Sequence, residues 1–475
     1  MTWRSSVAAG ALLIGAAGAV LAASTQSPHL SMAQAHPQQV PVSAAALSCP
    51  QPPAAPGSTT RLFAVGPGPV EASSPAPSLR LSTGRSATDE LATTSLPRVP
   101  LRVALPRAPG ARAGALVTAG GALAVGVTAA ELSTYSSRRS SGSAVTGCFA
   151  PRPQWWFTGV DTSIGTTTHL QVSNPGTGVA VVDLALLGPE GPVRAAGSRD
   201  LAVAPRSTAT VDLAGLAPGR AALTVHVAAT RGTVSAAVST TRLEGLTPTG
   251  TEWVPPSSEP SRAVVVDAGV QGATTQRLVI ANPGPRQQLV AVRIIDRSGA
   301  FVSTALPDVQ VPPESVVVKA VTSITRRSTA AVELTSAAPI TGAIVSEVAT
   351  GGTRDFAVSG VSDPLSDPAV VPMWGGARLS VSLTATSPGA RSVRLRSVDG
   401  AGRQVASQTV TVPGARTISW SAPVGSRGSY VVITSSERDG LQAVATYRAP
   451  GGASQLPVLA GRRTVLEPVV VPLHP

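Results

Sequence analysis

Short apolar runs, separated by turns rich in glycine and proline, recur along the whole chain. Residues 179–187, 289–295 and 393–398 form three such runs, and a turn that contains glycine follows each of them. Runs of this length between turn residues are typical of β-strands. The chain has 46 Gly and 43 Pro in 475 residues, which interrupts it too often for long helices. The pattern therefore predicts an all-β protein.

A tight turn ends the strand before each of these runs, and its sequence repeats. It reads Asn174-Pro175-Gly176 and then Asn282-Pro283-Gly284, 282 − 174 = 108 residues further on, and Ser387-Pro388-Gly389 replaces it in a third copy. Proline suits the second position of a turn, and glycine accepts the positive φ that a type II turn needs at the next position. The asparagine oxygen is expected to accept a hydrogen bond from the backbone N–H two residues on. We interpret these residues as structural turns.

The order of strands repeats with a period of about 100 residues, which indicates a repeated unit of domain size. About seven short strands per unit is the number found in immunoglobulin-like β-sandwiches. The predicted fold is a row of immunoglobulin-like units after an N-terminal export segment. The predicted boundaries are 1–35 for the export segment, 36–153 for a degenerate first β unit with its linker, and 154–256, 257–374 and 375–475 for three sandwich units.

Two consecutive strands late in each unit are expected to form a hairpin. They are residues 115–118 and 123–127, 223–227 and 234–238, 331–334 and 340–344, and 430–433 and 441–445. A short segment that ends in proline follows the last three pairs, at 253–255, 368–372 and 468–472. Proline is tolerated on edge strands, so each segment is expected to be the edge strand that closes its unit.

The first 35 residues have the pattern of an export segment. Arg4 precedes the uncharged apolar run 7–23, and small residues that suit cleavage follow at 21–23 and 33–35. Cleavage would release a secreted protein, whereas an uncleaved segment would form a single N-terminal membrane anchor. Both alternatives place the rest of the chain outside the cytoplasm.

The chain has only two cysteines, Cys49 and Cys148, which lie on either side of the first unit. In an exported protein such a pair is expected to form a disulfide. The alternative, a thiol nucleophile, lacks a histidine nearby in the sequence.

The net charge of +12 comes from arginines that are scattered along the chain. Nucleic-acid binding requires a basic stripe with interleaved aromatic residues, and the sequence shows none. The charge predicts at most a general attraction to anionic polymers or lipid surfaces.

Motifs for catalysis, cofactors or metals are not visible in the sequence. The five histidines do not have metal-ligand spacing, and phosphate-binding, dinucleotide-binding and nucleophile-elbow motifs are missing. A pair of acids from distant strands, as in glycosidases, stays open. We therefore expect a protein that is not an enzyme and has no cofactor and no metal.

Most tryptophans lie at the predicted unit boundaries, at Trp155, Trp156, Trp253 and Trp374. Exposed aromatic rings on a sandwich can stack on sugars, which makes Trp155 and Trp156 candidate binding residues. The favoured interpretation is that the boundary tryptophans pack in the junctions between units.

The order of these motifs resembles a family of large exported proteins from high-GC Gram-positive bacteria that is known only as a domain of unknown function. The resemblance rests on Cys49-Pro50, Cys148, the segment 155–159 and the strand before Asn174-Pro175-Gly176. It implies an envelope-associated protein and brings no catalytic residues.

The expected function is that of a non-catalytic cell-envelope protein, a structural or binding scaffold outside the cytoplasm. Its expected partner is a cell-wall polymer or another envelope protein. The alternative is a glycan-binding or glycan-active module that uses the boundary tryptophans.

Overall fold

The structure, a computed structural model, describes residues 38–467 except 54, 56, 69–75, 84–88, 106–113, 326–327, 366–367, 424–426, 436–439 and 459. The predicted export segment and the predicted strand at 468–472 lie outside these residues. The chain divides into a large compact unit, residues 41–464, and a small unit with the residues up to 40 and from 465. In the small unit, β1 (Gln38–Pro41) pairs with β35 (Thr464–Glu467).

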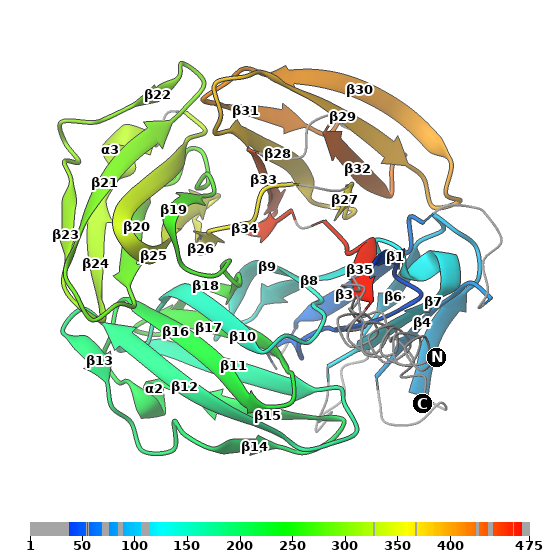
Figure 1. Cartoon of the computed structure of the whole chain (residues 1–475), viewed down its shortest axis with the longest axis horizontal. Helices are drawn as coiled ribbons and strands as arrows, with labels where there is room; N and C mark the ends of the chain where they lie inside the picture. Colours follow the sequence, from blue (N-terminus) through cyan, green and yellow to red (C-terminus); the bar gives the residue numbers. More distant parts are fainter. Residues whose placement is uncertain are drawn as a thin grey trace, which may run out of the picture. The chain divides into compact units, whose positions relative to one another are not determined.

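The large unit is built almost entirely of antiparallel strands, which confirms the all-β prediction. The described helices are single turns: η2 (Gly121–Ala124), α2 (Leu213–Leu216) and α3 (Thr322–Thr325). No described helix has both the length and the apolar character that a bilayer crossing requires. The strands fall into four groups (Figure 1). Three groups have two separate sheets, and in the third group one long strand belongs to both sheets and joins them into a single sheet of eight strands. We name the sheet with the first strand of a group its opening sheet, and the sheet with the last strand its closing sheet.

The first two groups have the following strands, given in the order in which they pair. In the first group the opening sheet is β2 (Ala44–Ser48), β7 (Leu116–Gly120), β4 (Ser78–Ser82) and β5 (Glu90–Thr94), and the closing sheet is β6 (Leu101–Ala104), β3 (Thr59–Val65), β8 (Thr128–Ser136) and β9 (Ser141–Gly147). In the second group the opening sheet is β10 (Gln154–Val160), β16 (Leu223–Arg231) and β12 (Ala180–Gly188), and β12 pairs in turn with both β13 (Gly191–Val193) and β14 (Leu201–Val203). The closing sheet is β15 (Ser207–Asp212), β11 (Thr166–Asn174), β17 (Ser235–Glu244) and β18 (Thr247–Val254).

The last two groups repeat this order. In the third group the opening sheet is β19 (Ser261–Val266), β25 (Ala331–Thr350) and β21 (Gln288–Ile295), and β21 pairs in turn with both β22 (Ala300–Phe301) and β23 (Val309–Val311). The closing sheet is β24 (Ser315–Ala320), β20 (Thr275–Asn282), β25 again and β26 (Thr353–Gly360). In the fourth group the opening sheet is β27 (Ala369–Pro372), β32 (Tyr430–Ser435), β29 (Arg391–Val398) and β30 (Gln404–Val412), and the closing sheet is β31 (Arg416–Ser421), β28 (Arg378–Ala385), β33 (Leu441–Ala449) and β34 (Gly452–Pro457).

The predicted hairpins are wrong in all four groups. In the first group, residues 123–127 are not a strand: η2 ends at Ala124 and β8 begins at Thr128. In the second group β16 lies in the opening sheet and β17 in the closing sheet, so the chain crosses from one sheet to the other between them. In the third group a single long strand, β25, makes this crossing: Ala331 pairs with Ile295 of β21, and Thr341 pairs with Ala281 of β20. Because both strands are buried on the core side, their apolar pattern cannot distinguish a hairpin from a crossing between sheets.

The predicted closing strand at 368–372 is also wrong. Its residues form β27, in which Val371 pairs with Val431 of β32, so β27 opens the fourth group. By contrast, Trp253 and Val254 lie in β18, an edge strand that closes its group as predicted. The division of the chain into separate domains stays a prediction.

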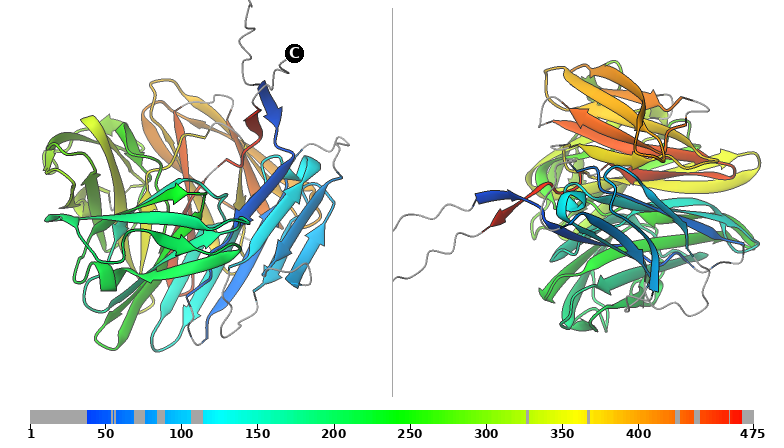
Figure 2. Two further views of the ribbon diagram at one scale, coloured as in Figure 1. Left: turned by 60° about the horizontal axis from the view of Figure 1, so that its bottom comes forward. Right: turned by 90° about the vertical axis from the view of Figure 1, so that its right-hand side faces the viewer.

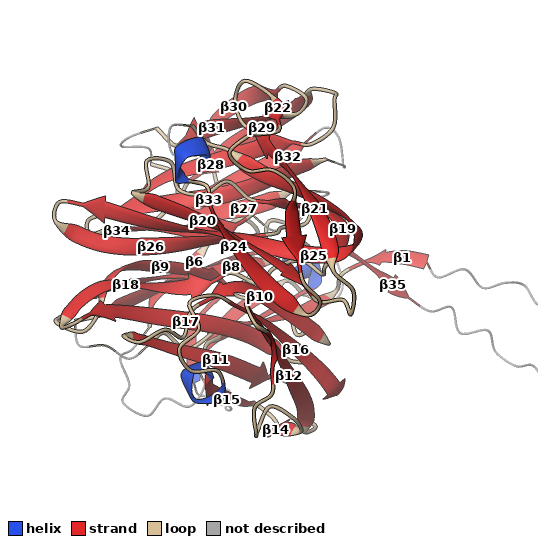
Figure 3. Cartoon of the chain, turned by 90° about the vertical axis from the view of Figure 1, so that its left-hand side faces the viewer, coloured by secondary structure: helices blue, strands red, loops and turns tan. Residues whose placement is uncertain are grey.

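The last strands of the four groups, β9, β18, β26 and β34, lie together at the centre of the large unit. Each contacts the last strand of the next group, and β34 contacts β9, so the four groups close into a ring (Figures 1 and 2). The hairpins that lead into these strands end at the same side of the unit (Figure 3). We name the central line between the four strands the axis.

Hydrophobic cores join neighbouring groups. One core cluster combines fourth-group residues with Phe63 and Leu132 of the first group, and another combines second-group residues with Val345 and Phe356 of the third. A smaller cluster joins the third group to Ala453 of the fourth. Since these side chains are buried between groups, each group stabilises its neighbours by the hydrophobic effect.

Candidate functional site

The two asparagines of the repeated turn hold their turns from inside. Asn174 accepts a hydrogen bond from the Gly176 N–H at 3.0 Å, and its Nδ2 donates to the carbonyls of Gly178 at 2.8 Å and Val203 at 3.0 Å. Asn282 accepts from the Gly284 N–H at 3.0 Å and donates to Arg286 at 2.8 Å and Pro312 at 3.0 Å. Both side chains are buried. The expected bond to the residue two positions on is therefore present, together with donor contacts that the sequence did not reveal.

The glycines of these turns have a different role from the predicted one. Neither Gly176 nor Gly284 has a positive φ, so the turns are not of type II. A Cβ at Gly176 would lie 3.1 Å from the Asn174 Oδ1, and one at Gly284 would lie 3.3 Å from the Asn282 Oδ1. Glycine is therefore favoured, because a larger residue would crowd the asparagine oxygen that lies against the backbone.

A strained turn completes the repeat and occurs in all four groups. A residue that is not glycine has φ of 67° at Arg98, 49° at Arg206, 47° at Glu314 and 51° at Ala415. The backbone N–H of each of these residues donates to a carbonyl in the repeated turn of its own group. In the same order, the acceptors are the carbonyls of Gly66, Gly176, Gly284 and Ser387. Such backbone conformations persist only where the surroundings enforce them. The first group thus has the same turn pair, although its sequence is degenerate.

The predicted disulfide between Cys49 and Cys148 is present. Cys49 directly follows β2 of the opening sheet, and Cys148 directly follows β9 of the closing sheet, so the bond links both sheets of the first group. Ser48 and Phe149 form a β-bridge beside it. The disulfide thus fixes the entry of the first group to its exit.

The candidate binding residues Trp155 and Trp156 are buried, with 1% and 9% of their surfaces exposed. The Trp155 indole donates to the Val234 carbonyl at 2.8 Å, and the Trp156 ring stacks on His226 with 3.9 Å between centroids. Neither ring offers a free face to a sugar in this structure. Trp253 packs with Tyr135 of the first group, which agrees with the predicted junction packing.

A buried acid lies on the axis where the other groups have glycine. Asp355 is near the start of β26, and Gly142, Gly250 and Gly452 lie near the starts of β9, β18 and β34. A Cβ on any of the three glycines would come within 2.4 Å of an Asp355 carboxyl oxygen. The Asp355 Oδ2 accepts from the backbone N–H groups of Ser143 at 3.3 Å and Ala453 at 3.2 Å. One side chain therefore contacts all three other groups.

A second acid, Glu252 of β18, lies on the axis two residues further along its strand than Gly250. Its Oε1 accepts from the Ser454 hydroxyl at 2.7 Å and from the Trp253 N–H at 2.8 Å. Ser454 in turn accepts from the Val145 N–H at 2.8 Å. This chain of hydrogen bonds connects the second, fourth and first groups.

Burial controls the protonation of these axial acids. Asp355, Glu252 and Glu131 of β8 are each at most 2% exposed. Burial raises the pKa of all three carboxyls well above the ordinary range, and the nearby Asp355 raises the pKa of Glu252 further. We name Asp355 and Glu252 the axial acids. A protonated acid in a dry site accepts and donates hydrogen bonds without the cost of a buried charge.

The axial acids are sealed from solvent, so they suit a structural role and not contact with a substrate. Within the described ranges, no three His, Cys, Asp or Glu side chains lie close enough together to hold a metal ion. The repeat itself gives the signal that could have found Asp355, because the other three hairpins have glycine at the corresponding position.

The face around the four hairpin ends, which we name the hairpin-tip face, is the exposed end of this axis. Arg138 and Arg139 are exposed in the β8–β9 turn, which Ser137 holds by accepting from the Arg139 and Ser140 N–H groups at 3.2 and 3.0 Å. Leu246 in the β17–β18 turn is 94% exposed. Arg354 pairs with Glu244 and links the second and third hairpins.

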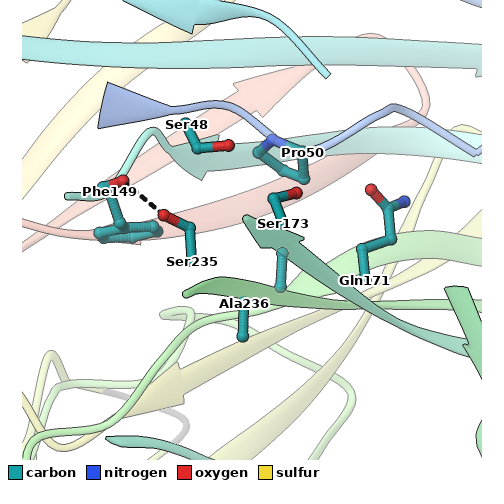
Figure 4. Close-up of a pocket in the computed structure, with 8 residues that line it drawn as sticks. Ser48, Pro50, Phe149, Gln171, Ser173, Ser235 and Ala236 are labelled. Atoms are coloured by element: carbon teal, nitrogen blue, oxygen red, sulfur yellow. Dashed lines mark hydrogen bonds between the residues drawn. The ribbon is translucent and has the colours of Figure 1, made fainter. Parts of the chain in front are cut away.

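A small crevice lies where the first group meets the second (Figure 4). Gln171 and Ser173 of β11 and Ser235 of β17 line it opposite Pro50. It leaves room for roughly one water molecule. Gln171 spans it by donating to the Gln51 carbonyl at 2.6 Å and accepting from the Gln51 N–H at 2.8 Å. The crevice is therefore a narrow seam that Gln171 bridges, too small for a ligand larger than water.

The comparisons agree with the resemblance seen in the sequence at the level of the family. A comparison with curated proteins found no match. A family model matches residues 104–423, which run from the end of β6 in the first group to just beyond β31 in the fourth. The chain thus belongs to a family of unknown function, DUF5719.

Proposed function

We propose that this protein is a non-catalytic, exported cell-envelope protein that acts as a structural or binding scaffold. The observation that carries the proposal is the closure of four strand groups around the axial strands. Cores shared between groups and the hydrogen bonds of the axial acids join the groups into one body. A body joined in this way holds surface loops at fixed positions, as a scaffold requires.

The Cys49–Cys148 disulfide supports export. Disulfides persist in oxidising compartments and are rare where thiols are kept reduced. Together with the N-terminal apolar run, the disulfide supports a location outside the cytoplasm, with the N-terminal segment either cleaved or retained as an anchor.

The proposed binding surface is the hairpin-tip face, and the proposed partner is an anionic cell-wall polymer. Arg138 and Arg139 are two adjacent, exposed guanidinium groups on a turn that side-chain hydrogen bonds order. The net charge of +12 adds a long-range attraction to polyanions. Arginine forms paired hydrogen bonds with phosphate and carboxylate groups.

The test is co-sedimentation of the protein with purified cell walls, with and without their anionic polymers, across a salt titration. We expect binding that requires the anionic polymer and weakens as salt is added. Replacing Arg138 and Arg139 by Gln is expected to weaken binding about 3- to 10-fold, since exposed ion pairs contribute roughly 0.2–1 kcal/mol each.

The matched control is Arg462→Gln with Arg463→Gln. The Arg462 carbonyl accepts a hydrogen bond from the Gly126 N–H, and Gly126 lies just before the start of β8. Arg138 and Arg139 lie just after the end of β8. The control pair and the tested pair therefore lie at opposite ends of that strand. Equal losses in both double variants would contradict the assignment of the surface. Salt-resistant binding to glycan without anionic polymer would instead favour the alternative, a glycan-binding module.

The immunoglobulin-like description of each group is part of this proposal only as a two-sheet architecture. β17 and β18, the last two strands of the second group, pair in one sheet as the last two strands of an immunoglobulin domain do, whereas β16 lies in the opening sheet.

A further inference from the structure

One strand at the rim of the large unit has an open edge, unlike its counterparts. β30 is the last strand of the fourth opening sheet and pairs only with β29 among the described residues. It has nine residues, and seven of them are exposed. Figure 1 and Figure 2 show it in orange on the outside of the unit.

The corresponding edges of the other three groups are protected. The second group has two strands of three residues, β13 and β14, and β13 contains Pro192. The third group has β22 with two residues and β23 with three. In the first group, β5 has five residues and carries Glu90 in an ion pair with Arg80 at 2.8 Å. Short strands, prolines and charges are the ways in which proteins block edge-to-edge pairing.

β30 has none of these features. Its sequence, Gln-Val-Ala-Ser-Gln-Thr-Val-Thr-Val, contains no proline and no charged residue and is rich in residues with high β-propensity. The neighbouring edge, β31, is partly occupied, because Thr417 donates its N–H to the Asp296 carbonyl at 3.0 Å and its hydroxyl to the Ile295 carbonyl at 2.7 Å. Of the two outer edge strands of the fourth group, β30 is therefore the open one.

We propose that β30 pairs antiparallel with β30 of a second copy of this chain. A two-fold axis that passes between Gln408 of one copy and Gln408 of the other lets all nine residues of both strands pair. On the solvent side, Ser407 of one copy then lies opposite Thr409 of the other, and Val405 lies opposite Thr411. On the other side, Ala406 lies opposite Val410. Such pairs stabilise antiparallel sheets, and no like charges face each other.

The pairing joins two four-stranded opening sheets into one continuous sheet of eight strands across a symmetric dimer. The partner is an identical chain, so the pairing needs no other protein. Because β30 lies on the rim, the dimer leaves the hairpin-tip face free. The dimer therefore adds to the proposed scaffold, and its test does not depend on polymer binding.

The position of the two-fold axis makes a sharp test possible. Opposed residues in antiparallel strands have Cα atoms about 4.5–5.5 Å apart, which suits a disulfide. In the full chain, Gln408→Cys is expected to form a disulfide-linked dimer under mild oxidation. Val405→Cys alone should not, whereas a mixture of Val405→Cys and Thr411→Cys chains should. A failure of Gln408→Cys to cross-link, or equal cross-linking of Val405→Cys alone, would overturn the proposal.

Sedimentation velocity provides the second measurement. The wild-type chain of 47.5 kDa is expected to pass from monomer to dimer as its concentration rises through the micromolar range. Thr409→Lys is expected to weaken this dimer at least 10-fold, because it adds the edge lysine that natural sheets use to prevent pairing. Thr93→Lys on the exposed part of β5 is the matched control and should leave the dimer unchanged. A wild-type chain that stays monomeric, or a dimer that Thr409→Lys leaves intact, would refute the pairing.

Discussion

β26 and β30 are both edge strands of their sheets, yet they have opposite surroundings. β26 lies on the axis, where strands of the other three groups cover it, and it is almost fully buried. β30 lies on the rim and is almost fully exposed. An edge strand is safe from unwanted pairing when other structure covers it. In this molecule the ring covers the axial edges, and short strands, prolines and charges protect three of the four corresponding rim edges.

The comparison also shows why polar residues differ between the two places. Uncharged Ser and Thr side chains on β30 face solvent, whereas Asp355 and Glu252 on the axial strands are buried and hydrogen-bonded. Buried polar groups cost free energy unless they find partners, but such partners also fix one arrangement of the groups. The axial acids thus contribute to specifying the ring.

The largest expected effect comes from filling the axis. Gly452→Val should lower the free energy of unfolding by about 3 kcal/mol, because its Cβ would lie 1.8 Å from the Asp355 Oδ2. Denaturant unfolding monitored by tryptophan fluorescence measures the change. Gly400→Val is the matched control, since a Cβ there has no neighbour within 4 Å.

Combining Gly452→Val with Asp355→Ala sharpens this prediction. Removing the carboxyl makes room for the new side chain, so the two changes should be non-additive by more than about 1 kcal/mol. Additive effects would show that the glycine is not required by the acid.

The second prediction concerns pH. Burial raises the pKa of Asp267, which follows β19, to about 8. Its folded pKa lies above its unfolded pKa, so its contribution is fully present below about pH 4 and is lost as the pH rises towards 8. The axial acids act in the same direction. The free energy of unfolding should therefore fall between pH 5 and pH 8.

Asp267→Asn tests this slope, because asparagine keeps the acceptor for the Ser362 hydroxyl, which lies 3.0 Å from the Asp267 Oδ1. Between pH 5 and pH 8 the free energy of unfolding of the variant should fall less steeply with pH than that of the wild type, by up to about 1.4 kcal/mol per pH unit. Asp399→Asn is the control, since a hydrogen bond from the Arg403 backbone lowers the pKa of this exposed carboxyl, the opposite direction from Asp267. Identical slopes for Asp267→Asn and wild type would contradict the argument.

The smallest expected effect concerns the turns away from the axis. Asn282→Ala removes the donor to Arg286 and Pro312 and the acceptor for Gly284, and should cost about 1 kcal/mol of unfolding free energy or somewhat more. Ser387→Ala, at the third copy, should cost less, because its hydroxyl contacts the Arg391 side chain at 2.9 Å and no bond to the Gly389 N–H is present in the described structure. Thermal unfolding of both variants compares them.

Much of the fold could be predicted because its signals are local. Short apolar runs between glycine and proline indicated the strands, the two asparagines marked the repeat, and two cysteines in a chain that was expected to be exported indicated the disulfide. The crossing between sheets could not be predicted in this way. β25 passes from one sheet to the other without a break, and its residues are apolar on both sides of the crossing.

The axial site was missed because its parts come from different groups. Glu252, Ser454 and Val145 are connected by hydrogen bonds, yet they are far apart in the sequence. Trp155 and Trp156 show the opposite case, since an aromatic pair that suggested a binding surface is buried. Composition cannot tell which side of a strand faces a neighbouring group.

Hydrogen exchange tests the central claim, that the four groups form one ring around the axial strands. Peptides that contain β9, β18, β26 and β34 should exchange at one slow rate, set by global unfolding, while peptides from β30 in a dilute Thr409→Lys sample exchange much faster. The four axial strands exchanging at separate rates, group by group, would contradict the ring and show that the groups unfold as independent domains.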